Sequence, residues 1–439
     1  MTSFTSRCTI IAAIALSAGC RTPAAQTVAS TSISDSAQVQ RDIEMLASDD
    51  FEGRRTGSVG NNRAADYLAS RYAALRLEPT PGKDPSCAAG CAASYLLPIV
   101  VFESIRDQPP ARLATQNVAG IIRGTDRALR DEYVVIGAHF DHLGRQTVGA
   151  MDPHSGDAIR NGADDNASGS AAVLSLARRL ALRPTKRSIL ITHFSGEEQG
   201  LLGSARFVEN PPVPLATMVA MVNFDMVGRM RDDKLIVYGV ATAAEMKSIL
   251  DSANASAPLR LTAVGDGFGP SDHSSFYSKD LPVLHFFTDS HEDYHRASDD
   301  ADKINVAGEV CVIDLAERAV RTIADRPTRL TFTKAPASAR AASSPSTGSA
   351  YFGSIPDMGA SDEDGMRISG VSAGGPAEKA GLKGGDLIVE FGGKPVKNIY
   401  DYTDAIGSYK PGDSIAVVVL RGTARERITI NVTLTRRGG

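Results

Sequence analysis

Five short segments, separated by long gaps, carry nearly all the acidic and imidazole groups that a two-metal site would need. Each segment ends or follows an apolar run with the composition of a buried strand. They are HFDH at 139–142, GADDNASG around Asp165, FSGEEQG around Glu197 and Glu198, VNFDMVG around Asp225, and DYH ending at His295. Because ligand sites of parallel sheets form beyond the carboxyl ends of the strands, this placement predicts one metal-dependent hydrolase site.

Strand-like and helix-like runs alternate around these segments. Short apolar runs predict strands, and apolar residues at helical spacing predict helices. The predicted strands span 117–123, 133–138, 188–194, 218–224 and 281–288, and the predicted helices span 39–46, 61–75, 168–182, 201–208 and 306–323. Such alternation predicts an α/β domain with a mainly parallel sheet.

The residue types in the five segments suit zinc. Zinc hydrolases use imidazole and carboxylate ligands, and a pair of zinc ions needs a carboxylate that bridges them. His139 and Asp141 lie two residues apart, so in extended chain both side chains point the same way and Asp141 can orient the imidazole. Asp165 lies in a small-residue turn before a helix, where it can present a bridging carboxylate. The adjacent Glu197 and Glu198 can divide metal binding and activation of water between them.

Residues 42–325 resemble the di-zinc aminopeptidase family of bacterial leucyl-aminopeptidase type, in the zinc exopeptidase superfamily. That family also includes glutamate carboxypeptidases and, as single-zinc relatives, glutaminyl cyclases. The resemblance rests on AHFDHLG, GADDNASG, SGEEQGLLGS, NFDMVGR and DYHRASD, which occur in the family's order and with similar spacing. It implies a three-layer α/β/α domain around a mixed, largely parallel sheet. It also implies a metallo-aminopeptidase that removes N-terminal residues from peptides and uses two Zn²⁺ ions.

The resemblance also assigns roles to single residues. The implied ligands are His139 and Asp225 for one zinc ion, Glu198 and His295 for the other, and Asp165 as the bridge, with a cis peptide bond to Asn166. Glu197 is the implied general base, which takes a proton from the bridging water and passes it to the leaving amine. Tyr294 is implied to donate its hydroxyl to the tetrahedral oxyanion. The complete ligand set argues against a glutaminyl cyclase.

Two other functions remain open at this point. A carboxypeptidase or dipeptidase could use the same two-zinc site, with Arg54, Arg55 or Arg229 as the anchor for a substrate carboxylate. A surface binding protein could instead use a C-terminal domain as its main module and the zinc domain as a scaffold. The five filled ligand positions argue against that scaffold.

Several polar residues near the motifs are predicted to play no direct part in metal binding. They are His193 and His285 as core or sheet-face residues, His142 as a support for its loop, Asp164 as a turn residue, and His291 and Asp299 as residues that orient the loop of Tyr294 and His295. Asp272 and His273, in GPSDHSSF, match a family segment that lines the pocket. A supporting role and a place in the substrate wall both remain open for them.

Residues 1–20 have the features of a signal peptide. Arg7 precedes an apolar stretch at 9–16 that is too short to span a bilayer. Ser17-Ala18-Gly19-Cys20 resembles a lipobox, in which Cys20 is acylated and becomes the first mature residue; an ordinary cleaved signal peptide is the alternative. We therefore expect an exported protein that is lipid-anchored at Cys20 and faces the periplasm or cell surface. The polar residues 21–37 are predicted to form a flexible tether.

Charge and cysteine usage constrain the partners and the compartment. The formal net charge of −4 shows no basic excess, which argues against nucleic acid as a partner. Export permits disulfides. Cys87 and Cys91 lie in a Gly/Ala/Pro-rich loop and are predicted to form a small bridge, because a zinc site there lacks two further ligands nearby.

The 439 residues are too many for one ordinary domain. Residues 38–330 are assigned to the peptidase domain, the Ala/Ser/Pro-rich residues 331–350 to a linker, and residues 351–436 to a small mixed α/β domain. YFGSI at 351–355 and GVSAGGPAEKAGLKGGDLIVEFGGKPV at 370–396 resemble a PDZ domain. In such domains backbone N–H groups hold a terminal carboxylate and a strand edge pairs with the peptide. We predict a module that docks peptide C-termini or partner tails, with a structural cap as the alternative.

Overall fold

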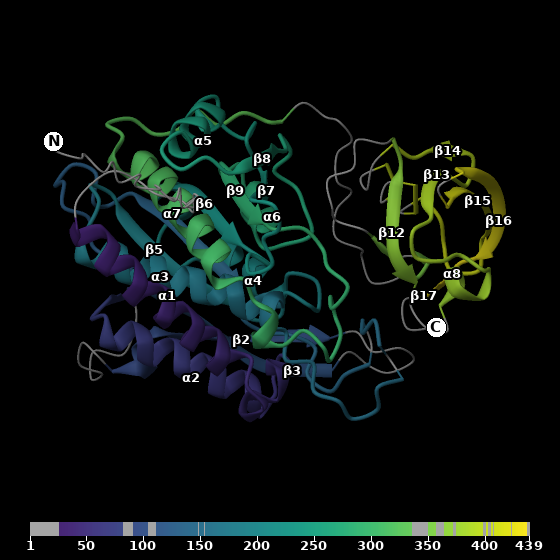
Figure 1. The fold of residues 1–439 in the computed structure, drawn as a ribbon, viewed down its shortest axis with the longest axis horizontal. Helices are drawn as coiled ribbons and strands as arrows, with labels where there is room; N and C mark the ends of the chain where they lie inside the picture. The colour runs from purple at the N-terminus through teal and green to yellow at the C-terminus, as the bar shows by residue number, and fades with distance from the viewer. Residues whose placement is uncertain are drawn as a thin grey trace, which may run out of the picture.

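The structure is a computed structural model, shown in Figure 1. It describes residues 26–81, 91–103, 111–147, 149–152, 154–335, 350–356, 364–371, 375–397, 401–402, 405–406, 408–422 and 424–436. The predicted signal peptide with its lipobox, Cys87 and most of the predicted linker lie outside the described residues.

A mixed sheet, with nine strands in the described part of the chain, forms the centre of the larger domain. Its strands are β1 (Glu78–Pro79), β2 (Leu96–Glu103), β3 (Ala111–Ile122), β4 (Tyr133–His139), β5 (Ser188–Phe194), β6 (Met218–Phe224), β7 (Lys234–Tyr238), β8 (Arg260–Ala263) and β9 (Val283–Phe287). The strand order is β1-β3-β5-β4-β6-β9-β7-β8, and β2 pairs with β3. Strands β5, β4, β6 and β9 run parallel, whereas β3 and β7 join this group antiparallel.

Helices cover both faces of this sheet. On one face α1 (Gln26–Leu46), α2 (Val59–Ala74), α3 (Gly169–Leu182), α5 (Met246–Asn254) and α7 (Val306–Asp325) share one apolar core with the strands. On the other face α4 (Leu202–Glu209) and α6 (His273–Tyr277) contribute to a second core. Alternate residues of β4 serve the two cores, with Val134 and Ile136 on one side and Tyr133 and Val135 on the other. The predicted three-layer α/β/α architecture is confirmed.

Every residue of β4, β5 and β6 is buried. A strand that is covered on both faces needs apolar residues throughout, which is why these strands are continuous apolar runs. In the parallel pairing His139 lies opposite Phe194, so β4 and β5 end at the same edge of the sheet. The polar segments that follow the strands therefore meet at that edge.

Short helical turns complete the described part of the domain. They are η1 (Asp49–Arg54), η2 (Ala92–Tyr95), η3 (Ala163–Ser168), η4 (Leu215–Thr217) and η5 (Ala301–Lys303). η1 precedes α2, and η3 is a single wide turn that leads into α3. Both are important for the site described below.

The prediction of a flexible tether over residues 21–37 is wrong from Gln26 onward, where α1 begins. The physical reason is a contact that lies far away in the sequence. The buried Asp35 carboxylate lies 2.5 Å from Arg179 Nη2 and 3.3 Å from Arg178 Nη2, both on α3. It also accepts a 2.8 Å hydrogen bond from Ser175 Oγ. This network fixes α1 against α3 at Asp35, although the Ser/Thr/Ala-rich composition of residues 21–37 is typical of a loop.

The larger domain extends beyond residue 330. Phe332 forms a bridge with Ala243 and packs against Tyr277, with ring centroids 5.9 Å apart. The backbone N–H of Ala335 donates to Tyr277 Oη at 2.9 Å. Residues 331–335 therefore belong to the peptidase domain and not to the predicted linker.

The C-terminal residues form a separate antiparallel sheet with its own core. Its strands are β11 (Ser354–Pro356), β12 (Met366–Val371), β13 (Leu387–Phe391), β14 (Lys394–Pro395), β15 (Ser414–Arg421) and β16 (Glu426–Thr433), while β10 (Ala350–Tyr351) pairs with β17 (Thr435–Arg436). Helix α8 (Pro376–Lys379) follows β12. Phe352, Phe391 and Val417 are completely or almost completely buried in this core. Among the described residues, no helix combines the length and the apolar composition needed to cross a bilayer.

Candidate metal centre

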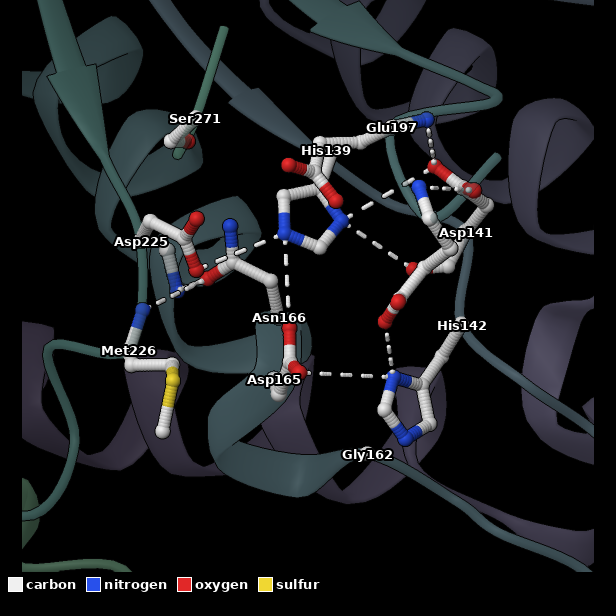
Figure 2. A network of polar contacts seen from close by, with 12 residues as sticks. His139, Asp141, His142, Gly162, Asp165, Asn166, Glu197, Asp225, Met226 and Ser271 are labelled. Atoms are coloured by element: carbon white, nitrogen blue, oxygen red, sulfur yellow. Dashed lines mark hydrogen bonds and ion pairs between the residues drawn. The ribbon is translucent and has the colours of Figure 1, made fainter. Parts of the chain in front are cut away.

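The structure brings the five predicted ligands together at the carboxyl edge of the sheet. His139 is the last residue of β4, Asp225 directly follows β6, and Glu198 lies in the loop after β5. Asp165 lies in η3, and His295 lies in the loop after β9. Figure 2 shows His139, Asp165 and Asp225 pointing toward one another.

Two sets of side chains share the carboxylate of Asp165. In the first set, His139 Nε2 lies 3.4 Å from Asp165 Oδ1 and 3.3 Å from Asp225 Oδ1. In the second set, His295 Nε2 lies 3.1 Å from Asp165 Oδ2 and 3.2 Å from Glu198 Oε2. The two oxygens of Asp165 thus face different sets, as a bridging carboxylate requires.

The donor spacing fits zinc. Ligand atoms about 2.0–2.1 Å from a tetrahedral zinc ion lie roughly 3.3 Å from one another. The four distances of 3.1–3.4 Å within the two sets agree with that value. His139, Asp165 and Asp225 form one group that could hold a metal ion, and His142, Asp165 and Glu198 form another.

His142 is closer to the second set than the prediction of loop support implies. Its Nδ1 lies 2.7 Å from Glu198 Oε1 and 3.7 Å from Asp165 Oδ2. Its Nε2 is buried and lacks a hydrogen-bond partner among the described residues. Because His142 uses Glu198 Oε1 while His295 faces Oε2, the two imidazoles hold opposite oxygens of one carboxylate.

Asp141 orients the glutamate pair more directly than it orients His139. Its carboxylate accepts hydrogen bonds from the backbone N–H groups of Glu197 at 3.2 Å and Glu198 at 3.4 Å. Thr56 Oγ1 donates to the same carboxylate at 2.9 Å. His139 Nδ1 lies 3.2 Å from the backbone oxygen of Asp141 but 3.8 Å from its carboxylate. The expected orienting role toward the imidazole is therefore performed by the Asp141 backbone.

The η3 turn is fixed by residues from distant loops. Asp299 Oδ2 accepts hydrogen bonds from the N–H groups of Asp164 at 3.0 Å and Asp165 at 3.1 Å. Asp164 in turn contacts His291 Nε2 at 3.1 Å and accepts from Gly228 N at 2.7 Å. Asp164 is thus a buried connection between three segments and more than a turn residue, and Asp299 holds the bridging turn. The Asp165–Asn166 peptide bond is cis, which confirms the expectation from the resemblance.

The electrostatics of the site favour bound cations. Burial raises the pKa of Glu197 well above its ordinary value, and the neighbouring carboxylates Glu198 and Asp225 raise it further. Burial also raises the pKa of Asp225. Burial alone would raise the pKa of Asp165, but the surrounding imidazoles outweigh it and hold that pKa well below the usual range. Such crowded, buried carboxylates are stabilised when positive charge lies between them.

Tyr294 lies beside the second set. Its ring stacks on His295 with centroids 3.8 Å apart and packs against the apolar cluster of Met226, Ile236 and Phe287. Burial raises the pKa of its hydroxyl well above 10, and the site carboxylates raise it further. The phenol therefore stays protonated at neutral pH and can donate a hydrogen bond.

The histidines inside the strands are buried in the domain interior, as predicted. His193 pairs with Tyr72 Oη at 2.6 Å. His285 stacks on His273 with ring centroids 4.3 Å apart. Asp272 and His273 are completely buried, and their polar side-chain atoms lack hydrogen-bond partners among the described residues. Burial raises the pKa of Asp272 to about 7. Because both side chains are completely buried, they support the site from the interior and do not form part of the substrate wall.

The three arginines considered as carboxylate anchors are engaged in other contacts. Arg54 is completely buried and donates to backbone carbonyls. Arg55 Nε donates to Gln146 Oε1. Arg229 donates to Asp293 Oδ2 from both terminal nitrogens at 3.1 Å.

The sequence predicts a disulfide between Cys87 and Cys91. Cys91 is disulfide-bonded, and Cys87 lies outside the described residues.

Comparisons with known proteins agree with this geometry. Residues 117–318 match Peptidase family M28, and residues 356–432 match the PDZ domain. A probable zinc metalloprotease of Pyrenophora teres f. teres is 30% identical over 164 residues, which cover 37% of this chain and 33% of that protein. Leupeptin-inactivating enzyme 1 of Streptomyces exfoliatus is 34% identical over 153 residues, which cover 34% of each chain. The matched region thus spans about a third of each of these relatives.

A solved structure shows the same fold. BSAP, a zinc aminopeptidase from Bacillus subtilis, aligns with a TM-score of 0.51 and 17% identity, over 67% of this chain and 98% of that chain. This likeness shows the fold of the larger domain, while the sequence matches assign the two parts of the chain. The chain carries a peptidase family M28 domain of zinc-exopeptidase fold, followed by a PDZ domain.

Proposed function

We propose that the protein is a zinc-dependent aminopeptidase that hydrolyses the N-terminal peptide bond of peptides. The observation that carries this proposal is the shared Asp165 carboxylate, whose two oxygens face two separate His-carboxylate sets. In this proposal His139 and Asp225 would hold one zinc ion, Glu198 and His295 would hold the other, and Asp165 would be shared by both sets. His142 supports the second set through Glu198 Oε1.

The bound zinc ions would polarise the scissile carbonyl and lower the pKa of the attacking water. Glu197 would take the proton from that water and give it to the leaving amine. Asp141 holds the backbone of Glu197 in place. Tyr294, kept protonated by its surroundings, donates to the oxygen that becomes negative in the transition state.

The positions of the arginines favour an aminopeptidase over a carboxypeptidase or dipeptidase. An enzyme that recognises a substrate C-terminus needs a cation that can contact a carboxylate. Arg54 cannot reach a substrate, because it is completely buried. Arg229 is already paired with Asp293. The acidic site itself complements a protonated N-terminal amine.

A panel of chromogenic aminoacyl amides, each with a free and an acetylated N-terminus, tests the proposal. We expect release only from the free-amine substrates, and we expect a zinc chelator to reduce the rate to background. Re-addition of zinc should restore it, which separates loss of metal from loss of protein. Release from acetylated peptides or from peptides with a required free C-terminus would contradict the aminopeptidase.

Zinc binding should become weaker as pH falls. Burial alone would lower the pKa values of His139 and His295, but the neighbouring carboxylates outweigh it and raise both pKa values well above the ordinary value. Zinc binds the neutral imidazole, so zinc binding must release these protons. The zinc dissociation constant should therefore increase as pH falls, which metal titrations at several pH values would measure.

We propose that the PDZ domain docks peptide C-termini. Strand β11 is at the edge of its sheet and directly follows Phe352 and Gly353, the middle of the predicted carboxylate-binding loop. Gly353 has a φ of 81°, a conformation that glycine adopts readily and that can turn backbone N–H groups toward an anion. Peptides with a free C-terminus should bind more tightly than the same peptides with an amidated one in fluorescence polarisation. Equal binding of both would favour a structural role.

We also propose that the protein is exported and carries a lipid anchor on Cys20. The lipobox-like Ser17–Cys20 supports the anchor, and the disulfide at Cys91 supports an oxidising compartment. Intact mass spectrometry of the mature protein would detect a lipid on Cys20, and an unmodified mature N-terminus downstream of Cys20 would contradict the anchor.

A further inference from the structure

We propose that Arg54 is a positioning residue that sets the zinc affinity of the site by clamping its two central ligand segments together. Arg54 is the last residue of η1, and its side chain is completely buried. It is not a ligand and does not contact the reacting atoms. The inference rests on the zinc-binding part of the proposed function.

The guanidinium joins the two segments through backbone carbonyls. Arg54 Nε donates to Phe140 O at 2.7 Å, between His139 and Asp141. Its Nη1 donates to Asn161 O at 2.6 Å, and its Nη2 donates to Gly162 O at 2.9 Å, three residues before Asp165. A planar guanidinium has donors in a fixed fork, so these three bonds fix the distance between the His139 and Asp165 segments.

The rest of the Arg54 segment is attached to the same loop. The backbone N–H of His142 donates to Arg54 O at 3.4 Å, and Asn61 Nδ2 donates to the same oxygen at 3.1 Å. A Cβ atom at Gly53 would lie 2.2 Å from Arg160 O, so the segment packs against its neighbours without room for a side chain. The backbone of Gly53 and Arg54 is therefore fixed by its neighbours, which holds the Arg54 side chain in place.

Arg54 also supplies a fixed positive charge behind the ligands. Among the described residues, no carboxylate lies within ion-pair distance of it. Burial lowers its pKa to about 10, and Asp165 and Asp141 oppose that decrease, so Arg54 stays charged at neutral pH. A buried cation that lacks a direct partner is costly unless nearby negative charge offsets it. Here the acidic ligand cluster provides that charge, which links Arg54 to the metal site as well as to the backbone.

The test compares Arg54→Lys with Arg187→Lys in the full chain. Lysine keeps the charge but cannot form the fork. Arg187 is also almost completely buried, donates to Glu132 Oε2 and to the Arg326 backbone oxygen, and links β5 to the end of α7 away from the site. For each protein, zinc affinity would be measured by competition with a chromogenic chelator, and the melting temperature of the zinc-free protein by circular dichroism.

We expect Arg54→Lys to raise the zinc dissociation constant about 10- to 100-fold, the size usual for residues that orient metal ligands. Arg187→Lys should lower the melting temperature of the zinc-free protein at least as much as Arg54→Lys does. Its zinc dissociation constant should stay within about threefold of the wild-type value, because the contacts of Arg187 lie away from the ligand segments. Equal zinc affinity in Arg54→Lys and wild type, or an equal loss in both variants, would overturn the inference. Failure of wild type to bind zinc would instead refute the proposed function.

If Arg54→Lys does not fold, hydrogen exchange of the zinc-free wild type tests the same clamp. We expect the amides of Phe140, His142 and Ala163, which donate to backbone oxygens, to stay protected after zinc removal. Rapid exchange of these amides in an otherwise protected domain would show that zinc, and not Arg54, assembles the two segments.

Discussion

Glu197→Gln should reduce kcat by about a hundredfold to ten-thousandfold while both zinc ions stay bound. General base catalysis contributes effects of this size, and an amide of the same shape cannot take the proton. Glu197 suits this role because the Asp141 carboxylate holds its backbone N–H, together with that of the proposed ligand Glu198, at the edge of the site. Steady-state kinetics on an aminoacyl amide, combined with zinc content by elemental mass spectrometry, would measure both parts.

The matched control is Glu209→Gln, the same chemical change at the end of α4. Glu209 is exposed, and among the described residues its one ion pair is with the exposed Arg206, three residues earlier. Surface ion pairs of this kind contribute little, so kcat and zinc content should both match wild type. A Glu197→Gln enzyme with more than about a tenth of wild-type kcat would contradict the general-base role. Loss of zinc from that variant would instead indicate that Glu197 is a ligand.

The central strands could be predicted from sequence because their burial is uniform. The predicted bounds of β5 and β6, at 188–194 and 218–224, are the observed ones. A strand covered by helices on both faces is apolar throughout, which makes its ends visible where polar residues begin. Strand β8 was not predicted, since it is largely exposed and its sequence, RLTA, lacks such a boundary.

The ligand positions could be predicted for the same reason, since each follows the end of a strand or a small-residue turn. The residues that hold the ligands could not. Arg54 bonds to Gly162, 108 positions away, and Asp299 bonds to Asp165, 134 positions away. Such contacts leave no local spacing in the chain. The concentration of Gly, Arg and Thr in FEGRRTGSVG was the available signal, and it indicated only a loop.

Zinc stoichiometry should distinguish the bridging carboxylate from a terminal one. The two carboxylate oxygens of Asp165 face different sets, and Asp165→Asn replaces one of them with an amide nitrogen. One set therefore loses its shared ligand atom, and the other keeps an oxygen that no longer carries negative charge. We expect fewer than two zinc ions per chain and a loss of activity of more than about a thousandfold, because both metal functions depend on this residue.

Asp225→Asn is the informative comparison, because, of the two sets in the described structure, Asp225 contacts the first, through His139. Asp225→Asn should weaken zinc binding at the first set. The zinc affinity of the second set, with Glu198 and His295, should stay close to that of wild type. Calorimetric zinc titrations would then show two sites in wild type, one unchanged site in Asp225→Asn, and no unchanged site in Asp165→Asn. If Asp165→Asn kept one site at wild-type affinity, Asp165 would belong to a single set. The two sets would then be independent metal sites, and the shared-carboxylate geometry from which the aminopeptidase is inferred would no longer support it.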